Sequence, residues 1–341
     1  MMRALNAVRI LAAGVLTAAA LAVPVVAAGS GAVAGAATCP AQTAAFGDAP
    51  FAEGLGTIGD GTVWAGNFAD ATVTHYAAAT GAVLGSITAT DATPNLSRPI
   101  GVVVDASGNI YVADRTTQTV YRFNSSGTQT LALGTSNATP DFDTPVGVAV
   151  DGSGNIYVTD KGNASVYRFN SSGTQTLHIA ASAATPNLSS PFGIAVNPSG
   201  SAIHVADEIT NTIYTFDSSG TQTATIAATA GTPNLSDPQG MALDTLGNLY
   251  VANRNAVNVF DPSGTQILAI DSTVATPNLS EPEAVAAGPQ GTIYVSDEDT
   301  DHIYTFCTGI AAAATTTTTA STTTTTAAAA EPVSTAPAFT G

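Results

Sequence analysis

Acidic or amide side chains recur at one position along the chain, each directly after a short apolar run. The six members are Asn67, Asp114, Asp160, Asp207, Asn253 and Asp297. Carboxylate and amide oxygens are the ligands that Ca²⁺ prefers, so a ring of such groups could hold a calcium ion or orient a sugar. Alternatively, each side chain ends a strand and accepts backbone hydrogen bonds from its own loop, which also explains its recurrence and requires no cofactor.

Charged side chains occupy the next loop position in successive repeats. They are Arg115, Lys161, Glu208, Arg254 and Glu298, and Arg98 joins them from a neighbouring loop. These six are the candidate ligand-binding residues, because their cations could receive an anionic ligand such as a sugar acid or a wall polymer. Acidic residues are interspersed among them, namely Glu281, Glu283, Asp299 and Asp301. Ordinary solvated loops are therefore the competing interpretation.

The four histidines do not form a recognisable set. His75, His178, His204 and His302 fall at non-equivalent positions of the repeat, so we do not expect them to converge on one zinc ion. The sequence also holds no serine nucleophile motif and no glycine-rich phosphate loop that leads into a helix. We therefore assign no catalytic residue.

These side chains belong to one repeat. Residues 120–131 (VYRFNSSGTQTL) recur unchanged at 166–177, and the prolines Pro99, Pro145, Pro191, Pro238 and Pro282 are 46, 46, 47 and 44 residues apart. Within the unit 145–189, four β-rich runs (GVAVD, NIYVTD, SVYRF and TQTLHIA) alternate with short Gly, Ser and Asn turns. Four short antiparallel strands in about 45 residues are typical of one propeller blade. No run has the periodicity of a helix.

Two further features of the repeat have structural roles. Gly101, Gly147, Gly193 and Gly240 follow the prolines by two residues, at the start of the innermost strand, where blades crowd the axis. The turn from Asp105 to Asn109 places a carboxylate where it can accept backbone N–H groups of the turn itself.

The segment from Pro145 to Asp160, PVGVAVDGSGNIYVTD, resembles the NHL repeat. The resemblance covers roughly residues 46–306 and implies a six-bladed β-propeller, a fold that hosts many unrelated activities. Related propellers include calcium-dependent gluconolactonases, whose opening Glu-Gly is similar to Glu53-Gly54. Streptogramin lyases are also related, with repeats similar to Gly288–Ile293. The later Asn and Asp motifs of the first group and the His/Glu pair of the second are not recognisable here.

Blade counting predicts how the ring closes. Blades begin near residues 51, 98, 144, 190, 237 and 281, and the last one stops after its third strand at Phe306. We expect segment 39–48 to supply the missing outer strand. The only two cysteines, Cys39 and Cys307, would then form a disulfide across the closure, which is worth about 3–5 kcal/mol in the loop-entropy model.

The N-terminus predicts export. Residues 1–37 contain two arginines, a long uncharged run and a flank of small residues, which together indicate a secretory signal; an uncleaved anchor is the alternative. The net charge is −17, and it becomes −19 without this segment, which holds two of the eight basic residues and no acidic one. A chain with this negative charge would repel nucleic acid. Its 45% hydrophobic content excludes global disorder.

Residues 310–341 are rich in Thr and Ala and cannot build a core, so a disordered spacer is expected. They end in Pro337–Gly341, which resembles a degenerate cell-wall sorting motif or matches one by chance. We therefore predict an all-β protein with a signal peptide (1–37), a six-bladed propeller (39–309) and a tail. The expected function is extracellular binding of a protein or wall carbohydrate by a monomer. The alternatives are a metal-dependent lactonase or lyase with an axial acidic site, and a ligand-sensing ectodomain.

Overall fold

The computed structural model describes residues 41–47, 52–271, 273–275 and 277–310. The predicted signal segment, Cys39, the first two and last residues of segment 39–48, and nearly all of the predicted tail lie outside these residues. Within them, no helix is long and apolar enough to cross a membrane.

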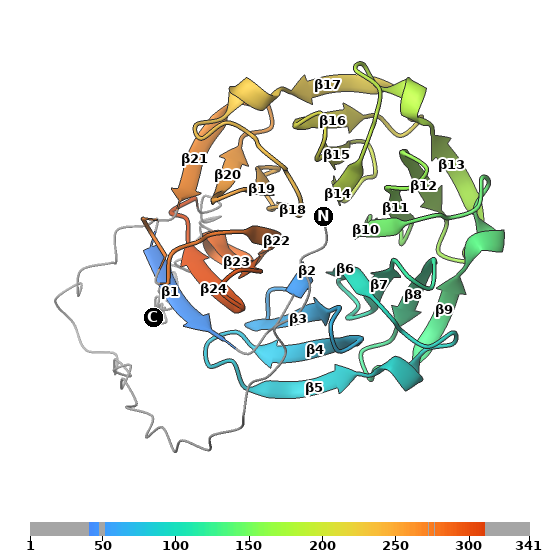
Figure 1. Ribbon diagram of the computed structural model, residues 1–341, viewed down its shortest axis with the longest axis horizontal. Helices are drawn as coiled ribbons and strands as arrows, with labels where there is room; N and C mark the ends of the chain where they lie inside the picture. The colour runs from blue at the N-terminus through green and yellow to red at the C-terminus, as the bar shows by residue number, and fades with distance from the viewer. Residues whose placement is uncertain (1–40, 48–51, 272, 276, 311–341) are drawn as a thin grey trace, which may run out of the picture. The chain divides into compact units, whose positions relative to one another are not determined.

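The six-bladed propeller predicted from the repeat is confirmed (Figure 1). Each blade is a four-stranded antiparallel sheet whose first strand lies innermost. The first three blades comprise β2 (Ala52–Gly56), β3 (Thr62–Asn67), β4 (Thr72–Ala77) and β5 (Val83–Ile87); β6 (Pro99–Val104), β7 (Ile110–Asp114), β8 (Thr119–Phe123) and β9 (Gln129–Leu133); and β10 (Pro145–Val150), β11 (Ile156–Asp160), β12 (Ser165–Phe169) and β13 (Gln175–Ile179).

The other three blades follow in the same order. They comprise β14 (Pro191–Val196), β15 (Ile203–Asp207), β16 (Thr212–Phe216) and β17 (Gln222–Ile226); β18 (Met241–Leu243), β19 (Leu249–Asn253), β20 (Ala256–Phe260) and β21 (Gln266–Asp271); and β22 (Pro282–Ala287), β23 (Thr292–Asp297), β24 (His302–Cys307) and β1 (Ala41–Phe46). Among the described residues the only helical segments are short 3₁₀ turns, at Ala89–Asp91, Thr135–Asn137, Ala181–Ala183, Ala228–Ala230 and Pro289–Gly291.

The N-terminal strand closes the ring. β1 pairs antiparallel with β24, and Ala41 lies opposite Cys307. The last blade therefore takes its outer strand from the other end of the chain (Figure 1). Because Cys39 lies outside the described residues, the predicted disulfide with Cys307 stays a prediction.

The core lies between neighbouring blades. Twelve Tyr and Phe side chains on the second and third strands are almost completely buried there: Tyr111, Tyr121, Tyr157, Tyr167, Tyr214, Tyr250, Tyr304, Phe123, Phe169, Phe216, Phe260 and Phe306. Successive residues of a strand point to opposite faces of the sheet, and both faces are covered by neighbouring blades. Aromatic and β-branched residues therefore occupy nearly every position of these strands.

The loops that enter the inner strands are fixed by side-chain amides. Gln129 accepts a hydrogen bond from the Thr93 N–H at 2.6 Å and donates one to the Thr93 carbonyl at 3.3 Å. The same exchange joins Gln175 to Thr139 in the next blade. These clamps join the loops that lead into β6 and β10 to the outer strands β9 and β13.

Candidate functional site

A β-bulge at the start of the inner strand sets the position of one side chain in five of the six blades; in the fifth, β18 begins only at Met241. In β6, for example, Pro99 pairs with Asp114 and Gly101 with Ala113, so Ile100 has no partner of its own. Equivalent register shifts occur at Glu53, Val146, Phe192 and Glu283. Bulges re-aim side chains. We call the six residues at this repeat position the axial ring: Glu53, Ile100, Val146, Phe192, Gln239 and Glu283.

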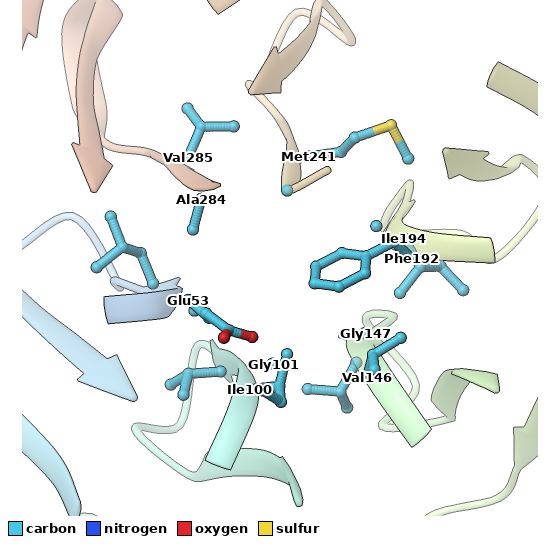
Figure 2. A pocket seen from close by; sticks show the side chains of 16 residues that line it. Glu53, Ile100, Gly101, Val146, Gly147, Phe192, Ile194, Met241, Ala284 and Val285 are labelled. Carbon is cyan, nitrogen blue, oxygen red and sulfur yellow. The ribbon is translucent and has the colours of Figure 1, made fainter. Parts of the chain in front are cut away.

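The axial pocket lies inside this ring, between the six inner strands. Figure 2 shows the Glu53 carboxylate and the Phe192 ring pointing into it from opposite sides, with Ile100 and Val146 between them. A volume of about 50 Å³ admits the edge of a ligand rather than a whole one. Its floor is formed by apolar side chains that also line a second axial cavity below, namely Leu55, Val102, Val148, Ile194, Met241 and Val285.

One half of the axial ring is polar. Glu53 accepts a hydrogen bond from Arg98 Nη2 at 3.3 Å, and Glu283 accepts one from Gln239 Nε2 at 3.1 Å. Burial raises the pKa of Glu53, against the opposing effect of the Arg98 charge. Burial, together with the nearby charge of Glu53, raises the pKa of Glu283 to about 9. Both shifts favour the protonated form, most strongly for Glu283, and a protonated carboxyl group can donate a hydrogen bond.

The other half of the axial ring is apolar. Ile100, Val146 and Phe192 form a small buried cluster against which Phe68 packs. The Arg98 guanidinium lies 4.5 Å from the centre of the Phe68 ring. The pocket thus has the Glu53 carboxylate on one side and an aromatic ring with aliphatic side chains on the other, whereas Gln239 and Glu283 are not among the residues that line it.

The charged rim predicted from the loops surrounds this pocket, and most of its cations are paired. Arg98 pairs with Glu53, Lys161 with Glu208, and Arg254 with Glu281 at 3.9 Å. Lys161 also lies 5.5 Å from the centre of the Phe192 ring. Because acids neutralise three of the four rim cations locally, the arrangement does not favour an anionic ligand. No ion pair of Arg115 or Glu298 is found among the described residues.

The recurrent acids hold the loops. Asp114 Oδ2 accepts the backbone N–H groups of Ser97 and Arg98 at 2.7 and 2.9 Å, and Oδ1 accepts those of Thr116 and Thr117. Asp160, Asp207 and Asp297 make equivalent bonds in their own blades. Asn253 accepts the Ser236 N–H, and Asn67 donates to Thr74. All six are buried. This geometry corresponds to the structural interpretation of the pattern rather than to a metal ring.

The residues of the axial ring do not fit a resident calcium ion either. Ca²⁺ takes six to eight oxygen ligands. The ring offers the oxygens of Glu53, Gln239 and Glu283, of which Glu53 is paired with Arg98 and Glu283 favours its protonated form. The facing half is hydrocarbon. In the part of the chain that the structure describes, no three His, Cys, Asp or Glu side chains are grouped closely enough to hold a metal.

Four axial-ring residues were absent from the sequence-based candidates: Ile100, Val146, Phe192 and Gln239. Glu53 and Glu283 were noted there without an assigned role. The signal was present in the sequence. Between the anchor proline and the glycine, the repeats read Ile, Val, Phe and Gln, with Glu at the corresponding places of the first and last blades, although flanking positions barely change. The blades therefore differ most in side-chain chemistry at a position next to the axis.

Comparisons with known proteins agree with the fold. The NHL repeat model matches residues 96–123, and the model of the SMP-30/gluconolactonase/LRE-like region matches residues 148–298. No curated protein sequence matches the chain.

Solved propellers are similar at low identity. A gluconolactonase of Xanthomonas campestris is 19% identical, with a TM-score of 0.59 over 79% of this chain and 94% of its own. A second structure, described as a putative gluconolactonase, is 15% identical, with a TM-score of 0.60 over 80% and 95%. Virginiamycin B lyase of Staphylococcus aureus is 13% identical, with a TM-score of 0.54 over 77% and 98%. At such identities the likeness shows the shared propeller fold.

Proposed function

We propose that this propeller binds a neutral carbohydrate unit at the axial ring. The observation that carries the proposal is the division of the ring into a polar half around Glu53 and Glu283 and an apolar half around Phe192. Sugar rings have the same division, with hydroxyl groups at the edge and C–H groups on the face. Carboxyl and amide groups bond the hydroxyls, while an aromatic ring covers the C–H face.

Charge supports a neutral ligand. The nearest rim cations are already paired with acids, and an anionic sugar would meet Glu53, Glu281 and Glu298 in a chain of net charge −17. A buried hydrogen-bond donor that stays unpaired costs free energy, so a protonated Glu283 would favour a partner that accepts a hydrogen bond. This points to the neutral sugar units of a wall polymer or a glycan. A protein ligand is the competing partner class.

Calorimetric titration with a panel of neutral mono- and disaccharides tests the proposal. We expect saturable binding by the wild-type protein and at least a tenfold weaker affinity for Phe192→Ala, because the substitution removes the aromatic surface. Ile209→Ala is the matched control, since Ile209 is an apolar side chain in a β15–β16 loop with 67% of its surface exposed. Equal losses in both variants, or no loss in Phe192→Ala, would contradict the proposal.

The two axial glutamates favour lactone hydrolysis as a second candidate. An ionised Glu53 would take a proton from a water molecule while the oxygen of that water attacks the lactone carbonyl carbon. Glu283 would give its proton to the ring oxygen as the C–O bond breaks, and a later proton transfer restores the pair. The match to the gluconolactonase-like family model over residues 148–298 is consistent with this reaction class.

This candidate makes its own prediction. Hydrolysis of glucono-1,5-lactone above the spontaneous rate should persist in EDTA and fall at least 100-fold in Glu283→Gln, which keeps the shape of the side chain but cannot give up the proton. A rate restored by added Ca²⁺ and abolished by EDTA would show metal-dependent catalysis instead. A rate equal to background would leave binding as the function.

We further propose that the protein acts outside the cytoplasm, tethered or released, with residues 1–37 removed. The support is the leader-like segment together with the closure strand β1, which places Ala41 opposite Cys307, two residues from Cys39. Intact mass spectrometry of exported protein under non-reducing conditions should show no alkylatable thiol. Two alkylated cysteines would contradict the disulfide, and an N-terminus at Met1 would contradict cleavage.

A further inference from the structure

The seam between the fourth and fifth blades has smaller side chains than the two seams that precede it. Each blade carries a row of three directly paired residues across its second, third and fourth strands. The row is Tyr111, Arg122 and Leu131 in the second blade and Tyr157, Arg168 and Leu177 in the third, but His204, Thr215 and Ala224 in the fourth. All three positions of the fourth blade are smaller than in the second and third blades. The sixth blade also has Thr305 and Ala44 at the last two positions but keeps Tyr294 at the first, so the loss of the second-strand aromatic ring distinguishes the fourth blade.

In the third blade these side chains fill the seam with the fourth blade. The Tyr157 hydroxyl donates to Asp151 Oδ2 at 3.0 Å, and Arg168 Nη1 reaches the Ser218 carbonyl of the next blade at 2.9 Å. A Cβ at Gly220 would lie 3.3 Å from Leu177, so the leucine touches the turn of the next blade as well. An aromatic ring, a guanidinium and an aliphatic side chain thus close the space.

The seam between the fourth and fifth blades is open instead. A cavity of about 340 Å³ lies there, with His204, Thr215 and Ala224 along one wall. Ile226, Leu243, Leu249 and Pro262 contribute apolar surface to it, and Asp261 lines its edge with Oδ1 engaged by the N–H groups of Ser263 and Thr265. Thr223, Ala224 and Ser263 at its edge are exposed, so the pocket opens to solvent and a small molecule can enter it.

The chemistry of the seam is changed as well as its size. The charged Asp151 and Arg168 of the third blade are replaced by Asn197 and Thr215, and both line the cavity. His204 Nδ1 lies 3.0 Å from Thr215 Oγ1, and burial lowers the pKa of His204 to about 4, so the imidazole is neutral. The walls therefore offer an uncharged hydrogen-bonding imidazole, hydroxyl groups and hydrocarbon.

We propose that this seam pocket is a second binding site, which takes a small neutral aromatic molecule with one hydroxyl group, of the phenol class. Such a molecule replaces the tyrosine ring that fills the equivalent space in the neighbouring seam, and its hydroxyl group pairs with His204 or the adjacent threonines. The site is independent of the axial ring, because it shares no lining residue with the axial pocket.

Titration with 4-methylphenol, followed by calorimetry and by ¹H–¹⁵N shifts of the full chain, tests the site. We expect one saturable site whose shifts centre on His204 and Ala224. The variant carrying His204→Tyr, Thr215→Arg and Ala224→Leu restores the third-blade row; it should lose at least tenfold in affinity, melt at a higher temperature and leave sugar binding at the axis unchanged.

Ala224→Leu alone fills part of the pocket and keeps the test valid if the triple variant folds poorly. Cyclohexane carboxylate, which is similar in size but charged, should bind at least tenfold more weakly than 4-methylphenol. No saturable binding by the wild-type protein, or equal 4-methylphenol affinity in the wild-type protein and the filled variants, overturns the proposal.

Discussion

Gly193→Ala should lower the free energy of unfolding by about 3 kcal/mol, because a Cβ at this position overlaps the backbone carbonyl oxygen of Gln239 in the next blade. The obstacle is backbone, so no rotamer change can relieve it. Gly193 also follows Phe192 directly, and any backbone shift that makes room for the methyl group moves the aromatic ring of the site. Urea denaturation followed by tryptophan fluorescence and circular dichroism measures the loss.

Gly85→Ala is the matched control. Gly85 is a strand glycine on β5 with ordinary backbone geometry, and no neighbouring atom lies within 4 Å of the Cβ that the substitution adds. We expect its unfolding free energy to change by less than about 0.5 kcal/mol or to rise slightly. Equal stability of the Gly193→Ala and Gly85→Ala variants would show that the blades are not packed as tightly at the axis as the structure requires.

Glu283→Gln should make the protein more stable than the wild type at alkaline pH. Burial and the charge of Glu53 raise the pKa of Glu283 from 4.5 to about 9, so in this interval the folded protein holds a proton that the unfolded chain has released. Unfolding then releases a proton, and the wild-type free energy of unfolding falls as pH rises, by up to about 1.4 kcal/mol per pH unit. A glutamine at this position has no proton to lose.

The difference in the free energy of unfolding between Glu283→Gln and the wild type should grow from pH 5 to pH 9. Denaturation series of both proteins, measured in parallel, test this. Asp70→Asn removes an exposed carboxylate and serves as the control, because its stability should follow that of the wild type throughout. A Glu283→Gln variant whose stability changes with pH as steeply as that of the wild type would mean that Glu283 is ionised in the folded protein. The polar half of the site would then carry two negative charges.

The sequence was sufficient for the fold because the fold repeats. Verbatim recurrence of residues 120–131 and regular spacing of the prolines indicate one unit copied six times, and a unit of four short strands has few ways to bury its two faces. The turn at Asp105 follows its local chemistry as well, since Oδ1 accepts the N–H groups of Ser107 and Asn109.

The site was harder to predict for the same reason. Recurrence draws attention to what is constant, such as the acid at Asp160, and constant residues in a repeat hold the blade together. Function lies where the repeats differ. Phe192 stands at a position that a bulge turns toward the axis, and a bulge leaves no local sequence signature beyond the glycine that follows. Gln239 is the corresponding residue of the fifth blade, where the inner strand begins only at Met241.

Pairing of the rim charges could not be predicted from the chain either. Lys161 and Glu208 lie in loops of adjacent blades, 47 residues apart, and only the closed ring brings them together. The same holds for Arg98 and Glu53, which are 45 residues apart. Counting cations on a face therefore suggested an anionic ligand, whereas the assembled face carries ion pairs around a neutral, two-sided pocket.

The most direct test of the axial ring as the ligand site is a crystal structure of the protein soaked with the sugar that binds best in the calorimetric panel. The result we predict is a sugar at the loop end of the axial pocket, with its C–H face against Phe192 and a hydroxyl group bonded to Glu53. A sugar seated elsewhere on the propeller, or an axial ring that no sugar of the panel contacts, would contradict the account.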